Sequence, residues 1–238
     1  MNYTTIETFD EKGFQEERKN GIGGSELGDI LGLDQYACQR KLWYKKKNFE
    51  IDYKRDDYAL RRGKRLEPVA RSYFEETSGR KVKHSLPTFA LKDSPHIRVN
   101  LDGLVLPQID GEECLVLEIK TLGVDSFERI KKLGIPETYV SQIQYGMGIA
   151  GVKKGVFVIY SPEYDDLTIS YIDFNESIFN GLKEAASNYW NNFIVGQYVP
   201  AQIEHEEDSI PTVCKNCEYR KKCKNLGSNG KPLQKDIF

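Results

Sequence analysis

Two short segments carry side chains that could bind a divalent cation and act on a phosphodiester. Asp102 precedes Gly103, and Glu118-Ile119-Lys120 follows sixteen residues after Asp102. Two carboxylates can share a divalent cation, and an ammonium group beside them can hold or polarise a water molecule. These residue types at this spacing favour a metal-dependent phosphodiesterase site.

Glu118 and Lys120 interrupt an otherwise apolar segment that reads as a buried strand over residues 113–121. We expect both side chains on one face, because strand side chains repeat every two residues. Burying a carboxylate and an ammonium without a function is costly. The same Glu-x-Lys pattern is nevertheless common on solvated strands, so a surface role stays open at this point.

A long amphipathic helix is predicted over residues 55–77, and it places Glu67 beside a buried stripe. The stripe residues recur at helical spacing: Leu66, Val69, Ala70, Tyr73 and Phe74. An acid at the margin of a buried face usually forms a salt bridge. It would also suit a metal ligand if the helix flanked a sheet.

The remaining pattern predicts strands at 81–91, 96–106, 156–160 and 167–172, with turns at Ser94-Pro95 and 107–111. Helices are expected over 36–47 with Leu42 and Trp43 inward, and over 137–150 with Gln142. Another spans 174–195, with a predicted inner face of Ile178, Leu182, Ala185, Tyr189 and Phe193. This order predicts an α/β (α+β) fold with a mixed sheet flanked by helices, whose first three strands form a meander.

The glycine-rich segment Gly21-Ile22-Gly23-Gly24-Ser25 leads into a predicted helix. A serine N-cap after glycines leaves exposed N–H groups that can bind an anion. A simple helix cap is the other interpretation.

The composition of the 238 residues is that of an ordinary soluble protein with one sizeable core. The net charge of -2 gives no overall basicity to argue for nucleic-acid binding, although a local basic channel stays possible. No stretch is long and apolar enough to span a bilayer, and the N-terminal residues open no signal peptide. We therefore expect a cytoplasmic protein.

Three of the five cysteines are spaced as ligands in Cys214-x2-Cys217-x5-Cys223. Zinc would need a fourth ligand such as His205 or Cys38, whereas an iron–sulfur cluster would prefer a fourth thiolate. Three unliganded, exposed thiols are the alternative. Cys114 lies within a strand-like segment and is expected to be a core cysteine.

Taken together, these motifs resemble the restriction-endonuclease-like nuclease superfamily with its Asp…(Asp/Glu)-x-Lys signature. Within it, residues 18–160 are similar to the lambda exonuclease and YqaJ-type viral recombinase group. The shared motifs are Gly21–Ser25, Tyr36…Leu42-Trp43, Gly63-x-x-x-Glu67, Asp102-Gly103-Leu104-Val105, Leu117-Glu118-Ile119-Lys120 and Pro136-x-x-Tyr139-x-x-Gln142-x-Gln144.

The resemblance implies a role for each motif residue. One or two Mg²⁺ or Mn²⁺ ions would be held by Glu67, Asp102, Glu118 and the Ile119 carbonyl. Lys120 would position the attacking water and stabilise charge on the phosphate, and Gln142 would support that water or a DNA phosphate. Arg18 and Ser25 match positions that grip a terminal 5′-phosphate in lambda-type enzymes.

The cysteines depart from the lambda-like pattern and resemble iron–sulfur nucleases of the CRISPR-associated and recombination-helicase types. Those enzymes place one cysteine before the nuclease core and three after it. That resemblance implies a [4Fe–4S] cluster on Cys38, Cys214, Cys217 and Cys223, which would tie the two ends of the chain together. Zn²⁺ is the alternative.

The sequence thus predicts a single nuclease domain over 1–238, with a core at about 18–196. A cysteine segment at 197–225 would pack with Cys38, and 226–238 would form a loose tail. We expect a metal-dependent 5′-to-3′ DNA exonuclease that makes single strands for an annealing partner. It could act as a homo-oligomer, as lambda-type rings do. Alternatives are a CRISPR-type nuclease that trims DNA ends or interferes with that process, and a non-catalytic DNA-binding module with a zinc-type cluster.

Overall fold

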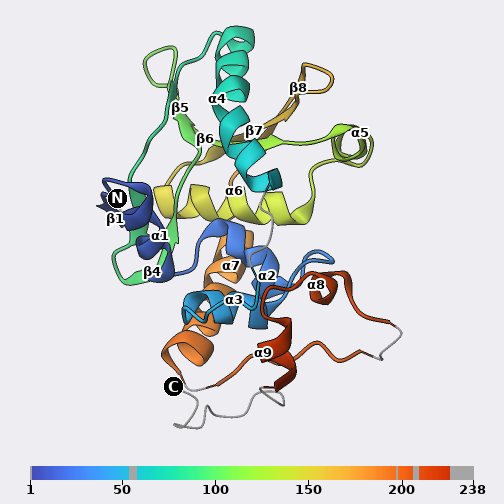
Figure 1. Ribbon diagram of the computed structural model, residues 1–238. Coiled ribbons are helices and arrows are strands. Elements are labelled where there is room, and N and C mark those ends of the chain that lie inside the picture. Colours follow the sequence, from blue (N-terminus) through green and yellow to red (C-terminus); the bar gives the residue numbers. More distant parts are fainter. Residues whose placement is uncertain (1, 54–57, 197, 206–208, 226–238) are drawn as a thin grey trace.

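A computed structural model describes residues 2–53, 58–196, 198–205 and 209–225 of the chain (Figure 1). The predicted tail at 226–238 lies outside these residues. The described strands are β1 Tyr3–Ile6, β2 Val82–Lys83, β3 Thr88–Leu91, β4 Ser94–Val99, β5 Gly103–Val105, β6 Leu115–Thr121, β7 Lys154–Ser161 and β8 Asp166–Asp173.

The described helices run from the N-terminal region to the cysteine segment. In chain order they are α1 Glu11–Lys19, the 3-10 turn η1 Gly24–Glu26, α2 Leu27–Leu31, α3 Gln39–Lys46, α4 Tyr58–Ser78, α5 Val124–Leu133, α6 Glu137–Ala150, α7 Glu176–Tyr189, the π-helical turn η2 Trp190–Val195, α8 Thr212–Lys215 and α9 Arg220–Asn225.

Within the described ranges, the larger sheet has the strand order β2-β5-β6-β7-β8. The β6–β7 pair is parallel, and the other neighbours are antiparallel. A smaller antiparallel sheet has the order β1-β3-β4. The predicted mixed sheet flanked by helices is therefore confirmed, and the apolar run at 156–160 forms the interior strand β7.

Helices cover both faces of the larger sheet (Figure 1). The side chains of β6 alternate between these faces, and apolar residues point to both. Leu115, Leu117 and Ile119 pack with Ala70 and Phe74 of α4 in one apolar cluster. On the other face, a second cluster joins Val116 to residues of α5 and α6. Helix α4 therefore covers one face of β6, and α5 and α6 cover the other.

Segments 81–91 and 96–106 were each expected to form a single strand. This prediction is wrong, because each segment divides between the two sheets. Between β2 and β3, Ser85 has a φ of 55° and Pro87 lacks a backbone donor, so pairing cannot continue. The chain likewise leaves β4 at Val99 and enters β5 at Gly103. The expected meander is wrong for the same reason. The turn expected at Ser94-Pro95 falls instead at 92–93, since Ser94 already begins β4.

The predicted helices over 55–77 and 137–150 correspond to α4 and α6, although residues 55–57 lie outside the described part. Val69 was expected in the buried stripe but is 46% exposed. Successive helical residues turn by about 100°, which takes Val69 off the face of Ala70 and Phe74. Cys114 is partly buried and precedes β6, so its expected place in the core is wrong.

The predicted helix over 174–195 is interrupted near its end. It forms α7, and a π-helical turn follows over Trp190–Val195. Side chains of the α3 region bond to carbonyls of this turn: Trp43 Nε1 donates to Phe193 O at 3.0 Å, and Lys47 Nζ donates to Ile194 O at 2.8 Å. Ile178, expected to be buried, is 41% exposed.

The C-terminal helices α8 and α9 lie beside α3, so segments from the two ends of the chain are neighbours (Figure 1). Tyr219 stacks on Tyr44 with ring centroids 5.0 Å apart. Asp52 accepts hydrogen bonds from Lys221 N–H at 2.8 Å and from Lys222 Nζ at 3.0 Å. None of the described helices has the length and apolar composition that crossing a bilayer requires.

Candidate functional site

The site begins where β5 separates from β6. Their pairing starts at Gly103 opposite Leu117, so the next residues of β6 have no β5 partner. Asp102 takes that place with its side chain, because its Oδ2 accepts a hydrogen bond from Ile119 N–H at 2.8 Å. The N–H and C=O of one strand residue point to the same side. The Ile119 carbonyl therefore also faces the edge that Asp102 occupies.

Glu118 and Lys120 project from β6 toward α6, on the face opposite Ile119. Glu118 is only 5% exposed, and its Oε1 lies 2.6 Å from Lys120 Nζ. Lys120 Nζ also donates to Gln142 Oε1 at 3.1 Å and lies 4.9 Å from the ring centroid of Tyr139. Gln142 and Tyr139 are one helical turn apart on α6. A buried carboxylate, a fixed ammonium and an amide thus meet at the end of β6.

Glu67 reaches the same edge from α4, on the side where Ile119 packs. Pro68 follows it inside the helix and cannot donate the usual hydrogen bond to the fourth preceding carbonyl. Glu67 Oε1 pairs with Arg71 Nη2 at 2.5 Å, one turn further along α4. Glu67 and Asp102 are partly exposed, whereas Glu118 is buried.

The charges of these carboxylates affect one another. Burial, followed by the Asp102 charge, raises the pKa of Glu67. Burial also raises the pKa of Asp102, against the opposing effect of Lys120. Burial, with the charges of Asp102 and Glu67, raises the pKa of Glu118 to about 7, although Lys120 opposes this. Burial alone would lower the pKa of Lys120, but Glu118 and Asp102 outweigh it and raise it.

In the described part of the chain, no group of three or more His, Cys, Asp or Glu side chains is placed to hold a metal ion. This finding covers the cysteines predicted to bind a cluster as well as the carboxylates. For the carboxylates, the contacts above give the reason. Glu67 is turned toward Arg71, Asp102 toward Ile119 N–H, and Glu118 toward Lys120. Their oxygens could point at a common centre only after side-chain rotations that break these contacts.

The glycine-rich segment lies against α6, next to this edge. Gly24 faces Gln142 so closely that an added Cβ would lie 3.1 Å from Gln142 Cγ. Arg18 Nη2 donates to Ser25 Oγ at 3.1 Å, so the structure brings these two predicted residues together. Lys46 Nζ fixes the segment by donating to Arg18 O at 2.6 Å and to Gly21 O at 2.5 Å.

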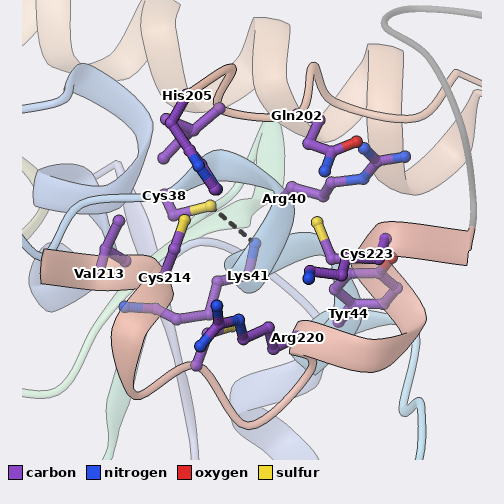
Figure 2. Close-up of a pocket in the computed structure, with 13 residues that line it drawn as sticks. Cys38, Arg40, Lys41, Tyr44, Gln202, His205, Val213, Cys214, Arg220 and Cys223 are labelled. Atoms are coloured by element: carbon purple, nitrogen blue, oxygen red, sulfur yellow. Dashed lines mark hydrogen bonds between the residues drawn. The ribbon is translucent and has the colours of Figure 1, made fainter. Parts of the chain in front are cut away.

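Cysteines from both ends of the chain line one pocket between α3, α8 and α9 (Figure 2). The four are Cys38, Cys214, Cys217 and Cys223. In Figure 2 the sulfur atoms of Cys38 and Cys214 face the same space, and His205 points into it from the opposite side. Burial, together with the charges of neighbouring cysteines, raises the pKa of the thiols at 214, 217 and 223. Cationic residues, among them Arg40, Lys41 and Arg220, also line the pocket.

Comparison with known families identifies the family to which these residues belong. The YqaJ-like viral recombinase domain matches residues 13–153, which include the glycine-rich segment, Glu67, Asp102, Lys120 and Gln142. The chain belongs to this family. A YqaJ-family relative, the uncharacterized protein YqaJ of Bacillus subtilis (strain 168), is 27% identical over 187 residues, or 78% of this chain. The chain spans only 57% of that relative's length.

Solved structures share the fold of this YqaJ-like chain. The alkaline exonuclease of Laribacter hongkongensis superposes with a TM-score of 0.63 at 19% identity, over 77% of this chain and 93% of the exonuclease. Its complex with dAMP gives the same score at 20% identity, over 78% and 93% of the two chains. A phage-related exonuclease from Haemophilus somnus 129PT gives 0.52 at 15% identity, over 74% and 95%.

Two residues at the site of this YqaJ-like domain were not predicted from the sequence. Arg71 pairs with Glu67, and Tyr139 lies under Lys120. The spacing of Arg71 four residues after Glu67 is a recognisable signal, because such pairs are neighbours on a helix surface. Tyr139 was noted only as part of a motif.

Proposed function

We propose that this protein is a Mg²⁺- or Mn²⁺-dependent DNA exonuclease that hydrolyses phosphodiester bonds at duplex ends. The observation that carries the proposal is the meeting of Asp102, Glu118, Lys120 and Gln142 at the gap between β5 and β6. Membership of the YqaJ-like viral recombinase domain family, and a fold shared with exonucleases, support the same conclusion.

The residues fit a divalent cation. Burial raises the pKa of all three carboxylates, and the charge of Asp102 adds to the rise in the pKa of Glu67 and of Glu118, as expected where carboxylates are crowded and partly desolvated without enough positive charge. The three carboxylates and the Ile119 carbonyl would hold one or two ions, since hard cations prefer oxygen ligands. When bound, such an ion would supply an activated water and charge stabilisation at the phosphate.

Lys120 would orient the attacking water and offset negative charge on the scissile phosphate. Its position suits this role, because Glu118, Gln142 and the Tyr139 ring each restrain the ammonium group. Gln142 would keep one amide donor for water or a phosphate oxygen while its Oε1 accepts from Lys120.

A 5′-to-3′ direction is supported by the Arg18–Ser25 pair. A guanidinium and a hydroxyl can bind phosphate oxygens together, and Gly24 places the segment against Gln142. Gripping a 5′-phosphate there would bring the first phosphodiester toward Lys120. The single strand left behind would be the substrate of an annealing partner, and a homo-oligomer enclosing the DNA would keep the enzyme on it.

The test is release of acid-soluble nucleotides from linear duplex DNA in Mg²⁺. Release should disappear in EDTA and in Glu118→Ala and Lys120→Ala, and should continue in the matched control Lys132→Ala, an exposed lysine of α5. Unchanged release by Lys120→Ala would refute the proposal. For the direction, Arg18→Ala should abolish the preference for 5′-phosphorylated over 5′-hydroxyl ends; equal use of both ends by the wild type would exclude this role.

A [4Fe–4S] cluster on Cys38, Cys214, Cys217 and Cys223 is proposed as a second, structural function. Four thiols in one pocket match the ligand number of such a cluster. The nearby Arg40, Lys41 and Arg220 would offset the negative charge of thiolates. A cluster there would tie α8 and α9 to α3, and so to Lys46 and the glycine-rich segment.

Metal and sulfide analysis of anaerobically purified protein tests this second proposal. Iron with acid-labile sulfide, lost in Cys38→Ser but kept in Cys114→Ser, is the expected result. Zinc without iron would instead support a zinc site, and the same metal content in both variants would remove Cys38 from it. A CRISPR-type end-trimming role, or interference with it, would be favoured over recombination if cleavage stopped after a few nucleotides. A zinc-bearing protein that bound DNA without cutting it would be the non-catalytic module.

A further inference from the structure

Arg71 is the cation that pairs with Glu67 at the edge of the site. Its Nη2 lies 2.5 Å from Glu67 Oε1, and its side chain is only 12% exposed, compared with 33% for Glu67. The buried Nε–H of Arg71 has no hydrogen-bond acceptor among the described residues. A buried guanidinium N–H without an acceptor leaves one hydrogen bond unmade, which a further oxygen ligand could complete.

The positive charge of Arg71 beside Glu67 opposes the binding of a metal ion there. The pairing with Arg71 occupies a lone pair of Glu67 Oε1 and holds a positive charge 2.5 Å from that oxygen, so a divalent cation at Glu67 has to compete with the guanidinium. The charge of Arg71 also acts on Asp102 as well as on Glu67. A cation that binds these carboxylates therefore meets a fixed positive charge, which weakens its binding until that charge gains an anion of its own.

We propose that Arg71 is a positioning residue that competes with the metal ion for Glu67 and is released to a nucleotide phosphate when substrate binds. This inference rests on the proposed function. The guanidinium fork matches phosphate oxygens, and its unused Nε–H gives the second donor of that fork. Metal and nucleotide then strengthen each other's binding, because the nucleotide removes the competitor of the metal.

Arg71 would thus delay full metal loading until a phosphate is present. This separates Arg71 from Lys120, which stays beside Glu118 and Gln142 on the other face of β6. A merely structural salt bridge predicts the opposite sign for its removal: the loss of Arg71 would disorder Glu67 and weaken metal binding.

The experiment is Mn²⁺ titration followed by electron paramagnetic resonance of the free ion, with and without dAMP, on the full chain. Without dAMP, Arg71→Met should bind Mn²⁺ about fivefold more tightly than the wild type, at the lower end of usual coupling strengths. Addition of dAMP should raise the Mn²⁺ affinity of the wild type about fivefold and leave that of Arg71→Met unchanged. Arg65→Met, at an exposed arginine of α4, is the matched control and should behave like the wild type.

The inference is overturned if Arg71→Met, without dAMP, binds Mn²⁺ no more tightly than the wild type does. It is also overturned if dAMP raises the Mn²⁺ affinity of Arg71→Met as much as that of the wild type. If Arg71→Met does not fold, Arg71→Lys serves instead. It keeps the charge but loses the fork, so its Mn²⁺ affinity should match the wild type while the dAMP effect falls. A nuclease-active wild type with no Arg71 effect refutes this inference alone. A wild type that neither binds Mn²⁺ nor releases nucleotides refutes the proposed function.

Discussion

Replacing Glu118 with glutamine should stabilise the metal-free protein at alkaline pH while abolishing nuclease activity. The folded-state pKa of Glu118 is raised from 4.5 to about 7 by burial and by neighbouring carboxylates. A raised carboxyl pKa means that ionisation opposes folding: the penalty is absent below about pH 4.5 and complete above about pH 7. At about 1.4 kcal/mol for each pKa unit, this rise corresponds to about 3 kcal/mol. Glutamine has nearly the same shape and carries no charge.

The assay is urea denaturation in EDTA at pH 5 and at pH 8, compared with Glu76→Gln at an exposed position of α4. Glu118→Gln should gain about 2–3 kcal/mol at pH 8 and about 1 kcal/mol or less at pH 5, where Glu118 of the folded wild type is already protonated. Added Mg²⁺ should stabilise the wild type more than the variant. A variant that is less stable at pH 8, or that gains equally at both pH values, would refute the account of a buried, charge-crowded carboxylate.

Two further substitutions test how Lys120 is positioned. Gly24→Ala places a Cβ 3.1 Å from Gln142 Cγ and 3.2 Å from Gln142 O. Nucleotide release should therefore fall several-fold, and the free energy of unfolding should fall by about 1–2 kcal/mol. In the control Gly181→Ala, no described atom lies near the added Cβ, so both the activity and the stability should be kept. Tyr139→Leu removes the ring 4.9 Å from Lys120 Nζ and should lower nucleotide release about fivefold, the equivalent of about 1 kcal/mol. Tyr139→Phe keeps the ring and should retain the activity, and equal loss in both variants would exclude the cation–π contact.

Local periodicity was enough to predict the elements that carry most of the candidate site. The bounds predicted for α6 match the structure, because Pro136 precedes its first residue and Gly151 follows its last in the left-handed conformation that ends many helices. The two-residue period of β6 likewise placed Glu118 and Lys120 on one face, where they form an ion pair. Short-range rules sufficed here because both elements have regular patterns and clear ends.

Features that depend on long-range pairing could not be predicted in the same way. The sequence contains no sign that the strand predicted over 96–106 changes sheets at Asp102, since that change depends on which strands lie nearby. This is also why Asp102 reaches Ile119 N–H, a contact that only the gap beside β6 allows. The alignment of Cys38 with the C-terminal cysteines likewise depends on how α3 packs against α8 and α9.

The central claim is tested most directly by incubating the protein with linear duplex DNA and with covalently closed circular DNA in Mg²⁺. If Asp102, Glu118 and Lys120 form an exonuclease site, mononucleotides will be released from the linear duplex alone, and Asp102→Asn will release none. Cleavage of the closed circle would contradict end-dependent action. Release from linear duplex that persists in Asp102→Asn would contradict the site itself.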